Sequence, residues 1–137
     1  MANATAGYSG TPLWRKLGLE PGCRFLVRDA PPAFGGLLAG APADVARLAR
    51  LADFDVSVQF ATSRDVLDRA LDLLVPHLRP HGMIWVAWPK KAAKVRTDIT
   101  EDVVREVALP RGLVDVKVCA IDATWSGLKL MRRRPAA

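Results

Sequence analysis

Polar and aromatic side chains that could bind a ligand follow several of the expected strands. They comprise Gln59 at the end of one strand, Lys90 and Lys91 after another, and Asp122, Trp125 and Ser126 between two C-terminal strands. Lysine ammonium groups bind phosphate or carboxylate, and a tryptophan ring offers a flat face for stacking. The pattern therefore predicts a site for an anionic small molecule.

Each of these residues also has a structural explanation, and the sequence leaves both interpretations open. The basic residues that follow Lys90 are typical of a solvated loop after a strand. The polar residues around Trp125 could serve only to shape a hairpin turn, and Asp98 could be a helix cap. Asp98 is nevertheless kept among the candidate ligand-binding residues, because it precedes a helix at the same side of the expected sheet.

Catalytic and metal-binding patterns are weak in this sequence. His77 and His81 are four residues apart, but Pro76 and Pro80 break the helix that would place them on one face. The two cysteines have neither metal-ligand nor redox spacing, and they are interpreted as small buried hydrophobes. We therefore predict no catalytic residue, no metal and no cofactor, and favour a protein that is not an enzyme.

The charge of the chain is unevenly distributed. The 137 residues carry a formal charge of +6, and residues 83–137 hold eleven basic and six acidic residues, which account for +5 of it. Part of this excess is Arg132, Arg133 and Arg134, which would either protect an edge strand or bind nucleic acid. Nucleic-acid binding through the basic C-terminal half is therefore an alternative function.

Hydrophobic periodicity predicts alternating strands and helices. The expected strands are 23–28, 54–61, 83–88, 113–121 and 128–132, and the expected helices are 12–17, 64–79 and 100–109. Residues 44–52 show a helical spacing, but a short strand at 45–49 is preferred because the chain must return to the sheet there.

This order of elements predicts an α/β protein with a three-layer, Rossmann-like, mostly parallel sheet of about five to six strands and a C-terminal antiparallel β-hairpin. Right-handed crossovers place helices 64–79 and 100–109 on one face, which leaves the other face thinly covered. Ser57 and Gln59 are assigned to that thin face, through which a second copy could form a homodimer. Residues 8–134 would form one domain between flexible termini at 1–7 and 135–137.

Four segments should meet where the carboxyl ends of the strands lie. These are residues 29–31, 59–63, 88–91 and 122–126. In an open parallel sheet, ligands bind outside the carboxyl ends of the strands, near the point where the strand order reverses.

Several motifs resemble those of a small bacterial family of unknown function. They are Tyr8-Ser9-Gly10-Thr11-Pro12-Leu13, Trp88-Pro89-Lys90-Lys91, Thr97-Asp98, and Val118-Cys119 with Trp125-Ser126-Gly127-Leu128-Lys129. The resemblance covers residues 8–133, implies no established reaction, and adds Tyr8 and Ser9 to the candidate ligand-binding residues. The order of strands is also similar to a shortened class I methyltransferase fold.

The sequence departs from active methyltransferases at two places. In Rossmann-type folds a glycine-rich turn follows the first strand, and an acid after the second strand binds the ribose. Here the first turn reads Asp29-Ala30-Pro31-Pro32, and Arg50 stands near the end of the second strand. A divergent S-adenosylmethionine-dependent methyltransferase is therefore the remaining alternative.

Neither export nor membrane insertion is expected. The first basic residue is Arg15, with no apolar segment of a signal peptide before it, and the apolar run 83–88 is far shorter than the ~18 residues of a membrane span. The sequence therefore predicts a cytoplasmic protein without membrane contact.

Overall fold

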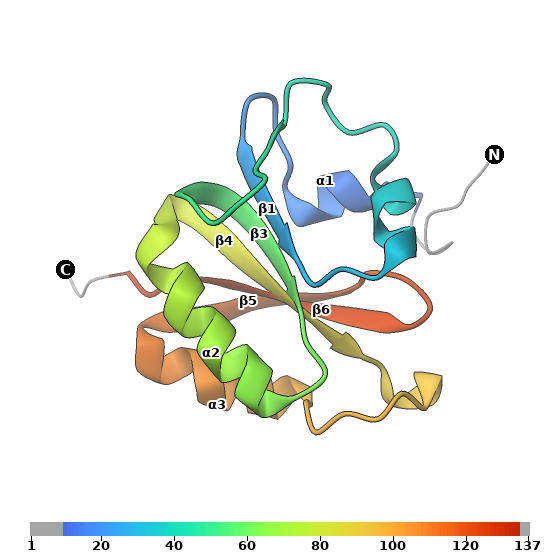
Figure 1. Ribbon diagram of the computed structural model, residues 1–137, viewed down its shortest axis with the longest axis vertical. Helices are drawn as coiled ribbons and strands as arrows, with labels where there is room; N and C mark the ends of the chain where they lie inside the picture. The colour runs from blue at the N-terminus through green and yellow to red at the C-terminus, as the bar shows by residue number, and fades with distance from the viewer. Residues whose placement is uncertain (1–9, 135–137) are drawn as a thin grey trace.

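Six strands form one mixed sheet in the order β2-β1-β3-β4-β6-β5. The structure is a computed structural model that describes residues 10–134, so Tyr8, Ser9 and the two termini expected to be flexible lie outside the described part. The strands are β1 Arg24–Arg28, β2 Ala46–Arg47, β3 Phe54–Phe60, β4 Leu78–Pro89, β5 Leu113–Ala120 and β6 Trp125–Arg132. Strands β1 to β4 are parallel, and β6 runs antiparallel to both β4 and β5. The predicted fold class is confirmed, including the hairpin (Figure 1).

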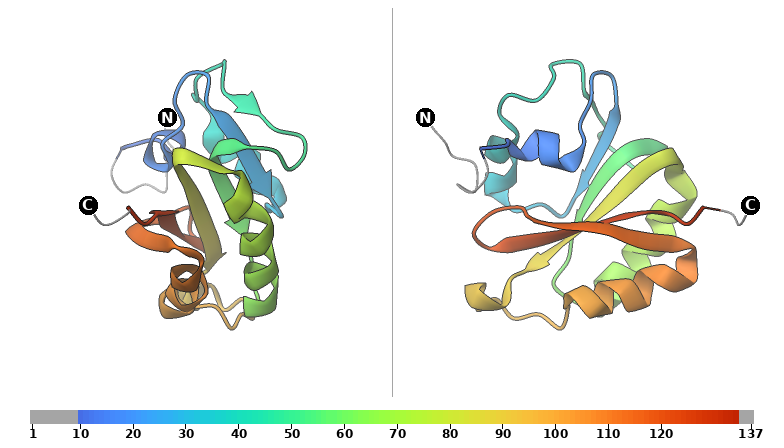
Figure 2. Two further views of the ribbon diagram at one scale, coloured as in Figure 1. Left: turned by 90° about the vertical axis from the view of Figure 1, so that its left-hand side faces the viewer. Right: turned by 180° about the vertical axis from the view of Figure 1, so that it is seen from behind.

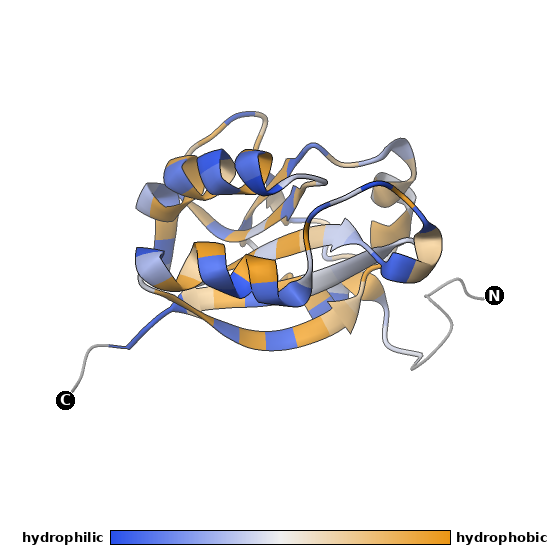
Figure 3. Ribbon diagram, turned by 90° about the horizontal axis from the view of Figure 1, so that it is seen from below, coloured by the Kyte–Doolittle hydropathy of each residue, from blue (hydrophilic) through white to orange (hydrophobic). Residues whose placement is uncertain are grey.

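Two amphipathic helices cover one face of the sheet (Figures 1 and 3). They are α2 (Arg64–Leu74) and α3 (Glu101–Ala108). The N-cap hydroxyls of Ser63 and Thr100 each accept a hydrogen bond at 3.2 Å, from the amides of Val66 and Val103. Apolar residues of both helices pack on Ile84 and Val86 of β4, which confirms that the two crossovers place these helices on the same side.

The opposite face is covered by shorter elements over only part of its width. Helix α1 (Leu13–Leu17) and the 3₁₀ helix η1 (Pro32–Leu38) pack on Val58 and Trp85, both fully buried. The Trp85 indole donates a hydrogen bond to the carbonyl of Leu17 at 3.0 Å. Beyond β4 the sheet continues as the β5–β6 hairpin, which neither element covers, as the right-hand view of Figure 2 shows.

The assignment of Ser57 and Gln59 to the thinly covered face is wrong. Both residues are buried, and they stand in register with Ile84 and Val86, whose side chains face α2 and α3. The face that α1 covers instead receives the apolar alternate residues of β3. A polar residue on a strand therefore did not mark solvent. The buried amide of Gln59 is hydrogen-bonded, as buried polar groups usually are, whereas the Ser57 hydroxyl has no partner among the described residues.

The segment between α2 and β4 also differs from the prediction. The helix expected at 64–79 ends at Leu74, the 3₁₀ helix η2 (Val75–His77) follows, and β4 begins at Leu78 rather than at Met83. Pro76 removes an amide donor that the helix would need. A register shift in the pairing with β3, between Phe54 and Val56, accommodates the extra residues as a bulge.

The short strand β2 confirms the choice of strand over helix at 45–49. Its two residues pair with β1 in parallel, and Leu48 donates its amide to the Phe25 carbonyl at 2.9 Å. The local apolar spacing predicts a helix here, but pairing with the sheet overrides it because backbone groups beside a strand must be satisfied.

The arginines at the end of β6 do not protect an edge. Strand β6 lies between β4 and β5, so β5 is the edge strand. Arg132 donates hydrogen bonds to the carbonyls of Val75 and Leu78, both at 2.8 Å, and Arg133 donates to Leu109 at 3.0 Å. Two of the three arginines thus bind carbonyl oxygens at the ends of α2 and α3, where a positive charge is favourable.

Neither a metal-binding group of three acidic, histidine or cysteine side chains nor a helix able to cross a membrane occurs within residues 10–134. Cys23 and Cys119 are free and half-buried, and burial raises the pKa of both thiols. A raised pKa leaves less thiolate at neutral pH, which agrees with their interpretation as small hydrophobes.

Candidate ligand-binding site

The strand order reverses between β1 and β3. From β1 the chain passes to β2 on one side, and the following strand β3 pairs on the other side of β1. The carboxyl ends of β1, β3, β4 and β5 meet at one edge of the sheet, which we call the carboxyl rim. All four segments expected there lie on this rim, where a crevice for ligands is anticipated in such sheets.

Gln59 organises the part of the rim at the reversal point. Its side chain is fully buried, and its amide oxygen accepts a hydrogen bond from Arg28 Nε at 2.9 Å. Its amide nitrogen donates to Asp29 Oδ2 and to the Phe60 carbonyl, both at 2.8 Å. With every polar atom of the amide engaged, Gln59 positions the turn after β1 and has no group left for a ligand.

Asp29 is held in an unusual backbone conformation in that turn. Its φ is +58°, in the left-handed region that non-glycine residues seldom adopt. Conformations of this kind persist where the surrounding structure enforces them, and they cluster at ligand clamps. The contact with Gln59 fixes one carboxylate oxygen of Asp29, and the exposed side chain also lines a hollow in the rim.

Three adjoining hollows form a groove along the carboxyl rim. The first, about 170 Å³, lies between Asp29 and Trp125, and the second, about 410 Å³, lies between Ser63 and Asp98. The third, about 450 Å³, lies between Lys90 and Thr100. The first and second share Thr62 and the second and third share Thr97, so we call them together the carboxyl-rim groove.

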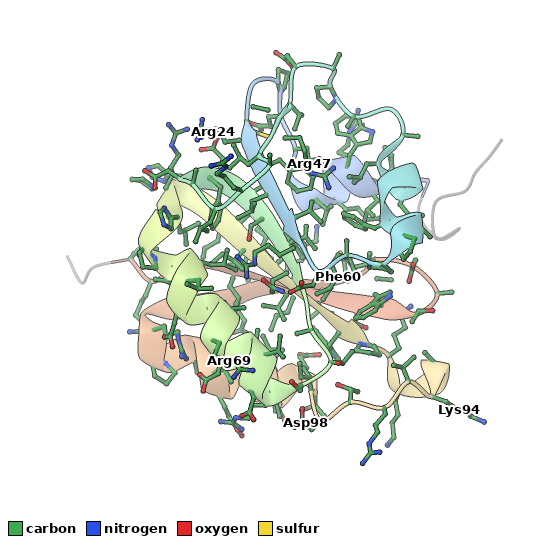
Figure 4. The ribbon with its side chains drawn as sticks, viewed as in Figure 1. Arg24, Arg47, Phe60, Arg69, Lys94 and Asp98 are labelled. Carbon is green, nitrogen blue, oxygen red and sulfur yellow. The ribbon has the colours of Figure 1, made fainter. Side chains whose placement is uncertain are left out.

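An aromatic wall closes the groove at the reversal point. The rings of Phe34 and Phe60 meet edge to face with centroids 5.0 Å apart, and Phe60 meets Trp125 in the same way at 5.0 Å. Trp125 is half-buried, and Phe60, which Figure 4 labels, is the ring that contacts both of the others. The indole of Trp125 is therefore fixed at its inner side by Phe60 and lines the first hollow.

The β5–β6 turn brings the hairpin to the rim. Asp122 Oδ1 accepts hydrogen bonds from the amides of Thr124 and Trp125, both at 2.8 Å, so Asp122 shapes the turn. The Thr124 carbonyl in turn accepts a hydrogen bond from the amide of Lys90 at 2.7 Å. Trp125 and Ser126, expected in the turn, are the first residues of β6, and Ser126 lines the third hollow.

The basic side of the groove follows β4. Lys90 and Lys91 line the third hollow, and the 3₁₀ helix η3 (Lys91–Ala93) ends at Lys94, whose φ is +56°. Arg96 lines the second hollow. None of these four cations has an acidic partner within the described chain, and Lys94 extends away from the protein (Figure 4).

Asp98 serves mainly as a cap. Its Oδ1 accepts a hydrogen bond from the amide of Arg64 at 2.7 Å, at the start of α2. The neighbouring Thr97 hydroxyl donates to the Thr62 carbonyl at 2.6 Å and thereby joins the loop to the end of β3. Sequence reasoning missed Thr62 and Thr97 as lining residues, although the Thr97-Asp98 motif was a signal that this loop has a defined position.

Seven of the predicted site residues lie on the carboxyl rim. Gln59 and Asp122 act through neighbouring backbone and side chains, whereas those that border the hollows are Lys90, Lys91, Asp98, Trp125 and Ser126. Tyr8 and Ser9 fall outside the described residues, so their predicted role stays a prediction.

Comparisons with known proteins identify the fold. No family model and no curated protein matches the chain in sequence. Its structure is similar to ribosomal protein L11 methylase from Lactobacillus delbrueckii subsp. bulgaricus (TM-score 0.57, 12% identity, covering 89% of this chain and 76% of that one). It is also similar to N-methyltransferase NodS from Bradyrhizobium japonicum WM9 (TM-score 0.56, 12% identity, 89% and 93% covered).

A third similar structure holds a ligand. Magnesium protoporphyrin IX methyltransferase from Synechocystis PCC 6803, described with bound S-adenosylmethionine, matches with a TM-score of 0.56 and 8% identity, covering 88% of this chain and 74% of that one. At such identities the likeness concerns the fold. The described chain has the Rossmann-like α/β fold of methyltransferases, which confirms the topology suggested by the order of its strands.

Proposed function

We propose that this protein binds a small molecule in the carboxyl-rim groove. The observation that carries the proposal is the position of three adjoining hollows at the carboxyl ends of the strands, beside the point where the strand order reverses. Open α/β sheets bind ligands at this place whatever their reaction.

The lining of the groove favours an anionic ligand that carries a planar group. Among residues 10–134, Lys90, Lys91 and Arg96 have no acidic partner, and they supply positive charge to the third and second hollows. Trp125 supplies an aromatic surface at the other end, fixed from behind by Phe60. A nucleotide or a similar adenosyl compound combines these two chemical features, with its ring at Trp125 and its anionic group near the lysines.

A divergent methyltransferase is the second candidate, and the similar structures support it. S-adenosylmethionine, when bound, supplies an electrophilic methyl group. The two places that hold such a cofactor in Rossmann-type folds are the turn after the first strand and the end of the second. The cofactor needs backbone amide donors at the first place and an acid for its ribose hydroxyls at the second.

The residues at these two places do not fit the usual cofactor contacts. After β1, Pro31 and Pro32 provide no amide donors. At the end of β2, the Arg47 guanidinium lies over the Phe25 ring at 5.5 Å, and no acid follows before Asp53 (Figure 4). A methyltransferase of this sequence would have to hold the cofactor by other residues of the groove.

Isothermal titration calorimetry separates the two candidates. The protein is titrated with adenosine monophosphate, adenosine triphosphate and S-adenosylhomocysteine, alongside the variants Lys90→Ala and Trp125→Leu. Arg69→Ala is the matched control, because Arg69 is an exposed cation on α2 away from the groove. We expect a nucleotide to bind, with affinity reduced about tenfold or more in the first two variants and unchanged in the control.

Binding of S-adenosylhomocysteine in preference to the nucleotides would support the methyltransferase candidate and place the ligand in the same groove. Absence of heat with all three compounds, together with unchanged thermal stability, contradicts the proposed function, because any ligand that binds the folded state raises the midpoint of unfolding.

A further inference from the structure

Two lysines face each other on the part of the sheet that α1 leaves uncovered. Lys117 of β5 and Lys129 of β6 are direct cross-strand partners. Lys129 in turn stands opposite Trp85, and its Nζ lies 6.0 Å from the centre of that ring, which places both lysines on the α1 side of the sheet. Directly opposed like charges on neighbouring strands are destabilising, so this pair calls for an explanation.

A β-bulge creates the pair. The register of β5 against β6 shifts between Asp115 and Lys117, which leaves Val116 as the additional residue. Asp115 therefore faces α3, where it binds Arg105, while Lys117 two positions later faces the opposite side. Without the bulge, Val116 would stand opposite Lys129. Bulges commonly re-aim a side chain toward a site, and here the re-aimed side chain is a cation.

No acid forms an ion pair with these lysines within residues 10–134. Every ion pair that the structure gives uses an arginine or His77, and none uses a lysine. Lys16 of α1 adds a third positive charge. Burial raises the pKa of the Cys119 thiol, and the charges of Lys16, Lys117 and Lys129 each act to lower it. Lys117 and Lys129 are cross-strand partners, and Cys119 follows Lys117 by two positions on the same side of β5. We call these lysines, together with Lys16, the lysine face.

A large cavity adjoins the lysine face. Its volume is about 610 Å³, and its lining includes the cation Lys129, the acids Glu20 and Asp55, and Cys23, His81 and Met83. It lies at the amino ends of the strands, on the opposite edge of the sheet from the carboxyl-rim groove. Asp55 already accepts hydrogen bonds from the Arg24 amide at 2.8 Å and from Arg79 at 3.4 Å, so its charge is compensated. His81 has a φ of +66°, a second constrained residue at the border of a cavity.

We propose that the lysine face and this cavity form a second binding site, for a phosphorylated small molecule. The phosphate would lie on Lys16, Lys117 and Lys129, since ammonium groups bind phosphate by charge-assisted hydrogen bonds. The rest of the molecule would occupy the cavity beside Lys129. A bound phosphate would remove the repulsion within the lysine pair. The site does not depend on the groove at the other edge of the sheet.

Cys119 provides a reporter for this site. In Cys23→Ser it is the remaining thiol of the chain, and its rate of alkylation by iodoacetate relative to neutral iodoacetamide measures the local positive charge. Inorganic pyrophosphate is the probe. We expect millimolar pyrophosphate to lower the iodoacetate rate more than the iodoacetamide rate. A second substitution, Lys117→Ala or Lys129→Ala, should raise the pyrophosphate concentration needed for half-maximal protection about tenfold. Arg69→Ala, on the opposite face of the sheet, should leave that concentration unchanged.

A second measurement tests the cavity. Among sugar phosphates and nucleoside monophosphates, at least one ester should protect Cys119 at lower concentrations than inorganic phosphate does, and Lys91→Ala at the carboxyl rim should leave this protection unchanged. Equal rates with and without pyrophosphate overturn the proposal. Protection by a single-stranded oligonucleotide but not by pyrophosphate also overturns it, in favour of a surface for nucleic acid.

Discussion

Gln59 holds the turn after β1 by connecting Arg28 to Asp29 in a partly buried place. It shares the interior of the sheet with Ser57, whose buried hydroxyl has no hydrogen-bond partner within residues 10–134. The two residues stand two positions apart on the same strand and face the same helices. At the residue scale, the Gln59 amide is a buried polar group that organises the candidate site, whereas the Ser57 hydroxyl only occupies space.

Replacing Gln59 by leucine should therefore destabilise the protein by about 1–3 kcal/mol, because Arg28 and Asp29 lose their shared partner in a partly buried place. Ser57→Ala is the matched control. It removes a hydroxyl that makes no hydrogen bond, so the free energy of unfolding should stay within about 0.5 kcal/mol or rise. Urea denaturation measures both, and an equal loss in the two variants would show that the Gln59 network contributes nothing specific.

Arg105 gives the stability a dependence on pH. Its side chain binds Glu101, Asp102 and Asp115, and the hydrogen bond to Asp115 lowers the pKa of that carboxyl below its ordinary value. An acid with a lowered pKa in the folded state stabilises that state when ionised. This contribution is present above the unfolded pKa of about 4 and is lost as the pH falls through the lower folded value.

Comparison of unfolding at pH 7 and pH 3 tests this pair. The wild type should lose stability on acidification, and Arg105→Gln should lose less, since its Asp115 has no cation to lower the pKa. Arg64→Gln, which removes a different exposed ion pair with Glu106, serves as the comparison. The interpretation fails if Arg105→Gln and the wild type lose equal amounts.

At the scale of elements, the bulge at the start of β4 determines how α2 returns to the sheet. Gly82 lies within it, and a Cβ on Gly82 would stand 2.8 Å from the Asp55 carbonyl oxygen and 2.9 Å from that of Arg79. Both atoms belong to the backbone, so neither can move away without disturbing the strand. The sequence pattern Pro80-His81-Gly82 predicts a turn before a strand, whereas the structure uses it within the strand.

Gly82→Ala should accordingly lower the free energy of unfolding by about 2–3 kcal/mol. Gly35→Ala in η1 is the control, because nothing lies within 4 Å of its added Cβ and its stability should be unchanged or higher by up to about 1 kcal/mol. Thermal unfolding of the two variants under one condition is sufficient. Equal midpoints would mean that the bulge can relax.

The elements with a clear period were predictable, and those fixed by distant pairing were not. Strand β3 and helices α2 and α3 follow from alternation and from the caps Ser63 and Thr100. The placement of α2 and α3 on one face of the sheet followed from the rule for crossovers. The bulges and the early start of β4 depend on register with neighbouring strands, and no local residue pattern encodes them. The rim segments were predictable, but the contacts that satisfy Gln59, Asp98 and Asp122 were not.

At the scale of the whole molecule, arginines and lysines occupy different parts of the protein surface. Arginines near the helix ends bind carbonyl oxygens or acids of the chain, whereas the lysines gather at the carboxyl rim and on the lysine face. The proposed homodimer through the thinly covered face would bring two lysine faces together. We therefore expect repulsion between the lysine faces to keep the protein monomeric at low ionic strength. Light scattering after size-exclusion chromatography measures its mass, and a stable dimer at low ionic strength would contradict this expectation.

The central claim is that ligands bind at the carboxyl rim, and mapping by nuclear magnetic resonance tests it most directly. During titration of the labelled protein with an adenine nucleotide and with S-adenosylhomocysteine, the amides of Thr62, Ser63, Lys90 and Thr97 and the indole of Trp125 should shift for the compound that binds. The amide of Arg69, an exposed residue of α2 away from both proposed sites, should stay unchanged. Shifts confined to other parts of the protein, or no shift with either compound, would contradict the account.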